Sequence, residues 1–195
     1  MTTMAMASSS SLRSATVPFL LLQLLFAAAT APAEATGGIL LPSCKTVGGG
    51  STYFDVQFCL DALGSVGAGA DARSYQDLAA VAVGLLAANA TSTSARIDGL
   101  LRGGVGIRKV DAATARCLRS CRALYAGVAR RQPACAAAVR GRRFGEARSS
   151  LEESAAAARG CEDGFRRGNA TSPVTAENDD AFKLAKLGVA LLAFA

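Results

Sequence analysis

The fold is decided by the run from Asp111 to Cys161, whose two halves both carry a helical pattern. The first half, DAATARCLRSCRALYAGVARRQPACAAAVRG (111–141), has apolar residues at alternating spacings of three and four. This is the periodicity of an amphipathic α-helix. Gly141 interrupts the pattern, and FGEARSSLEESAAAARGC (144–161) resumes it on one face. Two helices joined by so short a turn pack antiparallel, so the run predicts a helical hairpin.

The cysteines of this hairpin test its register. Cys121 and Cys161 lie equally far from a turn centred near residue 141, so their Cα atoms can come within the roughly 4.4–6.8 Å that a disulfide requires. Cys117 lies one helical turn before Cys121, and a Cys117–Cys161 bond is the alternative. Cys135 should face Ala147 and Cys117 the Phe165 region, where no thiol is present. We therefore predict that Cys117 and Cys135 are unpaired, or that one of them bonds between molecules.

The first 35 residues have the features of a secretory signal peptide. An apolar run, Phe19–Ala31, is too short for a typical membrane span and precedes Ala33-Glu34-Ala35, a small-residue cleavage site. We predict a signal peptide over 1–35, one mature domain over 36–195, and no membrane contact after cleavage. An oxidising compartment favours disulfides for the cysteines. Asn89-Ala90-Thr91 and Asn169-Ala170-Thr171 are candidate glycosylation sites.

Other segments complete an all-α architecture. Cys44 and Cys59 flank the Gly48–Ser51 loop and should close it, with short helices on both sides. Gly64–Ala72 has the composition of a linker. A long helix is predicted from Ser74, its N-cap, to Gly103, and a last helix over Thr175–Phe194 with Thr175 as N-cap. Together with the hairpin these helices predict an antiparallel four-helix bundle with a disulfide-closed N-terminal extension.

The composition excludes most catalytic chemistry. The chain has no histidine, which removes His-dependent nucleophilic catalysis, the common neutral-pH base and His-containing metal sites. Adjacent carboxylates, Glu152-Glu153 and Asp179-Asp180, point about 100° apart on a helix and form no catalytic pair. We expect neither enzymatic activity nor a cofactor or metal.

The basic charge is compatible with an acidic partner. The net charge is +6, and 15 Lys/Arg against 6 Asp/Glu fall within Arg102–Arg167. Such a surface suits an acidic polysaccharide or protein, but the preferred interpretation is that most of these arginines lie on the solvated faces of helices. Nucleic acid is not expected, because the chain is predicted to be secreted and no aromatic platform accompanies the arginines.

Several short motifs, in order, resemble the plant invertase and pectin methylesterase inhibitor family, in particular its pollen-allergen-like branch of invertase inhibitors. They are Cys44-Lys45-Thr46, Cys59, Cys121 with Leu124-Tyr125, Cys161-Glu162-Asp163-Gly164-Phe165, and Ser172-Pro173-Val174-Thr175 followed by Asn178. The resemblance spans Ile39 to Ala195. It implies a four-helix bundle with an N-terminal helical hairpin and the disulfides Cys44–Cys59 and Cys121–Cys161. It also implies a cofactor-free inhibitor, secreted to the apoplast or cell wall, that blocks the carbohydrate-binding cleft of its target. Cys117 and Cys135 depart from the family's four-cysteine pattern.

Three functions follow, in order of preference. The first is inhibition of pectin methylesterase through a stoichiometric complex that uses the broad faces of the bundle. The second is inhibition of invertase, in which family members can present Pro-Lys-Phe at the hairpin turn; here Arg142, Arg143 and Phe144 occupy those positions. A solvated turn with Phe144 packed beneath the hairpin is the alternative interpretation of these three residues. The third function is a cell-wall protein that holds acidic pectin without inhibiting an enzyme.

Overall fold

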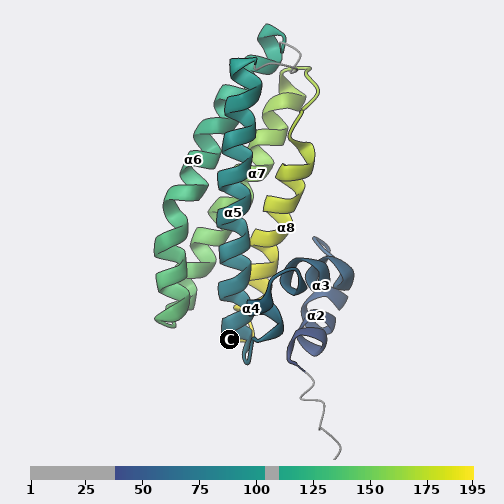
Figure 1. Ribbon diagram of the computed structural model, residues 1–195, viewed down its shortest axis with the longest axis vertical. Helices are drawn as coiled ribbons and strands as arrows, with labels where there is room; N and C mark the ends of the chain where they lie inside the picture. The colour runs from purple at the N-terminus through teal and green to yellow at the C-terminus, as the bar shows by residue number, and fades with distance from the viewer. Residues whose placement is uncertain (1–37, 104–109) are drawn as a thin grey trace, which may run out of the picture. The chain divides into compact units, whose positions relative to one another are not determined.

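The computed structural model describes residues 38–103 and 110–195, and this part of the chain is helical without strands. The predicted signal peptide lies outside the described residues. The helices are α2 (Leu40–Gly49), α3 (Val56–Gly64), α4 (Gly67–Ala70), α5 (Tyr75–Arg102), α6 (Ala112–Arg140), α7 (Phe144–Arg167) and α8 (Thr175–Leu191). Within 38–195, α5 to α8 are four long helices that run alongside one another (Figure 1). Each of them packs against two of the other three, so the predicted four-helix bundle is confirmed.

The ends of α5 follow from its sequence. The side chain of Ser74 accepts a hydrogen bond from the Asp77 amide at 3.1 Å, which confirms the predicted N-cap. Gly103 ends the helix in the left-handed conformation, with φ of 63°. By length and composition α5 could cross a membrane. In the bundle its apolar stripe, which includes Leu78, Leu86 and Ile97, is buried against α6 and α8.

The α6–α7 hairpin has the predicted register. Cys121 and Cys161 form a disulfide with their Cα atoms 4.8 Å apart, which excludes the alternative Cys117–Cys161 bond. The Sγ atom of Cys135 lies 3.6 Å from the carbonyl oxygen of Ala147, the residue predicted to face it. Cys117 faces the Phe165 region, because its Sγ lies 3.5 Å from the carbonyl oxygen of Gly164. Cys117 and Cys135 carry free thiols.

The N-terminal extension is closed by the predicted disulfide, Cys44–Cys59, whose Cα atoms lie 5.5 Å apart. Two details differ from the sequence prediction. The glycine cluster belongs partly to α2, where Gly48 is buried so tightly that a Cβ would lie 2.8 Å from the Val56 nitrogen. The predicted linker contains α4, and there a Cβ on Gly69 would lie 1.9 Å from the Leu63 carbonyl oxygen. In both places glycine permits close backbone contact, so the segment is compact rather than open.

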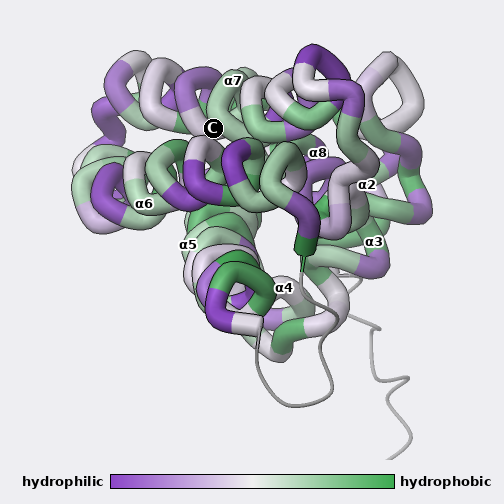
Figure 2. The backbone as a smooth tube through the Cα atoms, turned by 90° about the horizontal axis from the view of Figure 1, so that it is seen from above, coloured by the Kyte–Doolittle hydropathy of each residue, from purple (hydrophilic) through white to green (hydrophobic). Residues whose placement is uncertain are grey.

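The start of α8 also differs from the prediction. Val174, not Thr175, precedes the first helical residue, and it makes no side-chain cap. The hydroxyl of Thr175 instead donates a hydrogen bond of 2.8 Å to the Glu162 carboxylate on α7. Thr175 therefore bonds to another helix and does not cap its own. Along α6 and α7, hydrophobic and hydrophilic residues alternate (Figure 2), as expected for helices with one buried face.

Candidate functional site

The turn between α6 and α7 holds the three residues predicted to contact a target. The amide of Gly141 donates to the Ala137 carbonyl and the amide of Arg143 to the Ala138 carbonyl, both at 2.9 Å. These bonds close the end of α6. Arg142 has a φ of 56°, which is uncommon for a residue other than glycine. Gln76 of α5 adds a bond of 2.9 Å from its Nε2 to the Val139 carbonyl. The turn is therefore fixed by both backbone and side-chain bonds.

The three side chains of this turn differ in how free they are. The Arg143 guanidinium makes an ion pair of 3.0 Å with Glu146 and lies over Gly141, where a Cβ would be 2.5 Å from an Arg143 nitrogen. Phe144 is half-buried and packs against the core. Arg142 is exposed, with no ion pair among the described residues. The structure brings the three residues together, but only Arg142 presents an uncommitted side chain.

A second candidate surface is the outer face of α6. This helix contains six arginines and no acidic residue. Arg122 pairs with Asp98 at 2.7 Å and Arg131 with Glu153 at 3.3 Å. The other four, Arg116, Arg119, Arg130 and Arg140, are exposed and make no ion pair within the described part of the chain.

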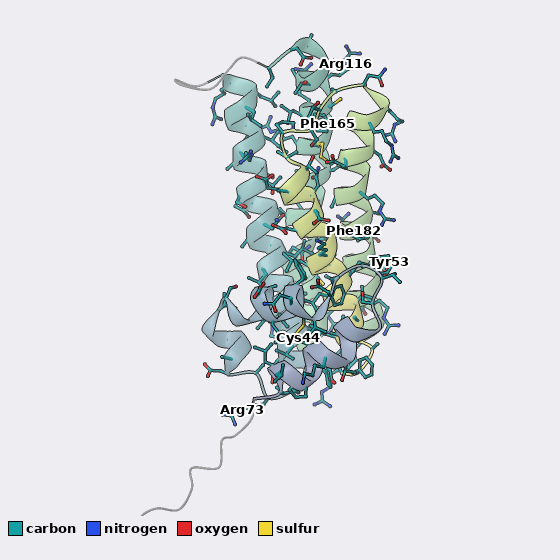
Figure 3. All side chains as sticks on the ribbon, turned by 90° about the vertical axis from the view of Figure 1, so that its right-hand side faces the viewer. Cys44, Tyr53, Arg73, Arg116, Phe165 and Phe182 are labelled. Carbon is teal, nitrogen blue, oxygen red and sulfur yellow. A yellow bond between two sulfur atoms is a disulfide. The ribbon has the colours of Figure 1, made fainter. Side chains whose placement is uncertain are left out.

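Three of these unpaired arginines form one line. At 3.6 residues per turn, Arg116, Arg119 and Arg130 fall within about 60° of the circumference of α6 and extend over about 21 Å. We call them the α6 arginine stripe; Figure 3 labels Arg116 on it. Nearby carboxylates do not neutralise this line, so it presents positive charge to solvent.

A buried polar network holds α6, α7 and α8 in register beneath these surfaces. The Tyr125 hydroxyl donates to the Asn178 side-chain oxygen at 2.8 Å, and the Asn178 amide donates to Glu162 at 2.6 Å. Burial, together with the carboxylates of Glu177 and Glu162, raises the pKa of Tyr125 well above its ordinary value. Tyr125 therefore stays protonated and acts as a hydrogen-bond donor.

The two glycosylation sequons lie in different surroundings. Asn89 lies inside α5, and its side-chain nitrogen donates to the Glu177 carbonyl at 3.3 Å. Asn169 is exposed, after the end of α7. Among the residues described, no group of three His, Cys, Asp or Glu side chains could hold a metal ion.

Sequence reasoning missed an aromatic groove at one end of the bundle. It is bordered by Tyr53, from the loop after α2, and by Phe194, beyond the end of α8. Neither residue belongs to a periodic pattern, and their approach depends on how the extension docks on α8. A Tyr within a Gly/Ser/Thr loop was the only local signal.

These features define a four-helix bundle that is braced by a disulfide and exposes arginines on the outer face of α6. The family model of plant invertase/pectin methylesterase inhibitors matches residues 42–191, and the chain belongs to this family. The family consists of inhibitors, not enzymes, directed at pectin methylesterase or invertase.

Solved structures agree on the fold. A mutant form A of a pectin methylesterase inhibitor from Arabidopsis is 18% identical with a TM-score of 0.65, covering 77% of this chain and 95% of that chain. A pectin methylesterase inhibitor from Arabidopsis thaliana is 17% identical with a TM-score of 0.56, covering 79% and 93% respectively. A search of curated protein sequences finds no match.

Proposed function

We propose that the protein is a secreted inhibitor of plant pectin methylesterase, which it binds stoichiometrically in the cell wall so that the carbohydrate-binding cleft of the enzyme is blocked. The observation that carries this proposal is the α6 arginine stripe on a broad face of the bundle. Two solved structures of similar fold are described as pectin methylesterase inhibitors, which supports the same target.

The stripe has the properties of a docking surface. Unpaired arginines attract an acidic partner over distances of about a Debye length, roughly 8–10 Å at physiological salt. At the rim of an interface they mainly increase the association rate, and they add bidentate hydrogen bonds where they meet carboxylates. The buried network of Tyr125 and the Cys121–Cys161 bond keep α6 and α7 rigid, so little conformational entropy is lost on binding.

The turn gives less support to invertase as the target. Proline is absent from the positions that the family's Pro-Lys-Phe segment occupies, Arg143 is paired with Glu146, and Phe144 is packed against the core. Insertion of this turn into a catalytic cleft would require both contacts to be broken. Arg142 remains free, so invertase inhibition stays the second hypothesis.

The deciding experiment titrates purified protein against a plant pectin methylesterase and a plant invertase. The double variant Arg119→Glu, Arg130→Glu should weaken esterase inhibition at least tenfold, because reversed charges repel an acidic partner. Arg148→Glu, an exposed position on α7, is the matched control and should inhibit like wild type. Unchanged esterase inhibition by the folded double variant would contradict docking through the stripe.

Invertase is tested in the same assay. If invertase is the target, Arg143→Glu should abolish its inhibition and leave esterase inhibition largely intact. If neither enzyme is inhibited at equimolar protein while polygalacturonate binds with strong salt dependence, the protein is a pectin-binding cell-wall component instead.

A further inference from the structure

Two exposed aromatic residues border the same groove. Among the described residues, the exposed large hydrophobic side chains are Leu41, Tyr53 and Phe194, which are 49%, 46% and 54% accessible. Tyr53 and Phe194 both line a groove of about 480 Å³, whereas Leu41 does not. This volume is within the range of about 300–1,000 Å³ typical of ligand sites. Apolar side chains exposed together, rather than scattered singly, indicate a binding surface.

Both rings are held in place by neighbours. The Tyr53 ring meets Phe182 edge-on, with centroids 5.7 Å apart and planes at 80° (Figure 3). The Lys186 Nζ lies 4.7 Å from the Tyr53 centroid. Phe194 stacks on Tyr75 with centroids 5.3 Å apart. Because these rings are already positioned, a ligand that stacks on them loses little free energy in ordering them.

The polar groups of the groove carry almost no net charge. Lys186 is the cation that lines it, and its Nζ is 2.5 Å from the Glu152 carboxylate, which lines it too. The remaining polar lining consists of hydroxyl side chains, namely Thr46, Ser51 and Thr52. Aromatic rings beside hydroxyls and a neutralised ion pair match a ligand with apolar faces and hydroxyl-bearing edges. A pyranose ring has this character.

One unpaired cation lies next to the groove. The Arg159 guanidinium carbon is 4.2 Å from the Phe182 centroid, so Tyr53 and Arg159 both contact Phe182. Arg159 is exposed, makes no ion pair among the described residues, and borders a smaller hollow of about 260 Å³ that Glu162 and Asp179 also line, so additional carboxylates of a ligand would be repelled there. A carboxylate on the ligand could pair with it through two hydrogen bonds. The surface as a whole therefore suits a chain that is mostly uncharged and carries few carboxylates.

We propose that this surface, the Tyr53 groove, binds a short galacturonan chain whose carboxyls are mostly methyl-esterified. Pyranose rings stack on Tyr53 and Phe194, and a free carboxylate, where present, pairs with Arg159. The choice of an esterified uronide over another pyranose chain rests on the proposed function. The assignment of the groove as a binding site does not rest on the proposed function, because none of the residues that line the groove belongs to the α6 arginine stripe.

The test is a calorimetric titration of the mature protein with highly methyl-esterified galacturonan oligomers and with fully de-esterified oligomers of the same length. Wild type should bind the esterified oligomers, with little change between low and physiological salt. Tyr53→Ala and Phe194→Ala should each weaken the affinity about tenfold by loss of a stacking ring. Leu41→Ala removes an exposed apolar side chain of the same extension outside the groove, and should bind like wild type. Circular dichroism checks that each variant is folded.

Two outcomes would overturn the proposal. One is the absence of binding to esterified oligomers by wild type, or equal binding by Tyr53→Ala. The other is binding of only the de-esterified chain, lost in high salt and in Arg119→Glu, Arg130→Glu, which would assign the polysaccharide to the arginine stripe. Esterase inhibition is measured in parallel and should persist in Tyr53→Ala. If wild type binds esterified oligomers but inhibits no esterase, the groove is upheld and the proposed function fails.

Discussion

Replacement of Tyr125 by phenylalanine tests whether the buried polar network holds the bundle together. Tyr125 is fully buried on α6, and its hydroxyl donates to Asn178 of α8 at 2.8 Å. Asn178 is 3% exposed and in turn donates to Glu162 of α7. Tyr125→Phe removes one oxygen and keeps the ring, so it deletes the hydrogen bond with little change in packing.

The expected loss of stability follows from the Asn178 side-chain oxygen, which the substitution leaves without its donor. Without the hydroxyl, the side-chain oxygen of Asn178 loses this donor in a place that water reaches poorly. Leaving a buried acceptor unsatisfied costs about 1–3 kcal/mol. For a domain of this size each kcal/mol lowers Tm by roughly 2–4 °C, so a loss of about 2 kcal/mol corresponds to about 4–8 °C.

The assay is urea unfolding followed by circular dichroism, with the disulfides intact. Tyr53→Phe is the control, because Tyr53 is exposed, and it should stay within about 0.5 kcal/mol of wild type. In a double-mutant cycle with Asn178→Ala, the two losses should sum to more than the loss of the double variant, by about 0.5–3 kcal/mol. A Tyr125→Phe protein as stable as wild type would refute the assigned role of the network.

Three further measurements check the site assignments. Glycopeptide mapping of the secreted protein should find glycan at Asn169 and none at Asn89, whose side-chain nitrogen is hydrogen-bonded within the bundle; glycan at Asn89 would contradict this contact. Thiol labelling of the folded protein should modify Cys117 before Cys135, because burial of Cys135 raises the pKa of its thiol and blocks access; equal rates would contradict the packing. Hydrogen bonds from Thr114 lower the pKa of Asp111 in the folded state, so its stabilising contribution is present above the unfolded value of about 3.9 and is lost as pH falls through the folded pKa. Asp111→Ala should therefore lower Tm at pH 6 and make Tm depend less on pH in the acid range. Thermal melts that match wild type across this range would contradict the stabilising role of the Asp111 cap on α6.

The parts of the fold that local chemistry determines could be predicted from the sequence. The three-and-four spacing of apolar residues predicted the hairpin, and the equal distance of Cys121 and Cys161 from the turn predicted its register, which the disulfide confirms. Ser74 capped α5 as predicted, and Asp111 caps α6 in the same way, because the capping hydrogen bonds are made within the next helical turn. These inferences rest on interactions within a few residues or on a strict helical repeat.

Predictions failed where a distant partner decided the outcome. Thr175 is the first residue of α8 rather than its cap, and its hydroxyl donates a hydrogen bond to Glu162, thirteen residues away on another helix. Within the Gly64–Ala72 segment, Gly67–Ala70 form α4, where Gly69 contacts the backbone of Leu63 more closely than a residue with a Cβ could, and composition alone did not predict this contact. The approach of Tyr53 to Phe182 likewise depends on geometry that no periodic pattern encodes.

Repulsion between the closely spaced arginines of α6 opposes folding. Arg116 and Arg119, and Arg119 and Arg122, are spaced i, i+3, so their like charges repel by a few tenths of a kcal/mol per pair. Of these three, only Arg122 has a carboxylate partner within the described residues. On the inner face of the same stretch, the Cys121–Cys161 bond closes a loop with a separation of 40 residues, which the chain-entropy estimate values at about 4 kcal/mol. The cross-link therefore outweighs the repulsion and lets α6 keep a charge pattern that the fold does not need. The charges of the stripe therefore cost the fold little, and under the proposed function an acidic partner would use them.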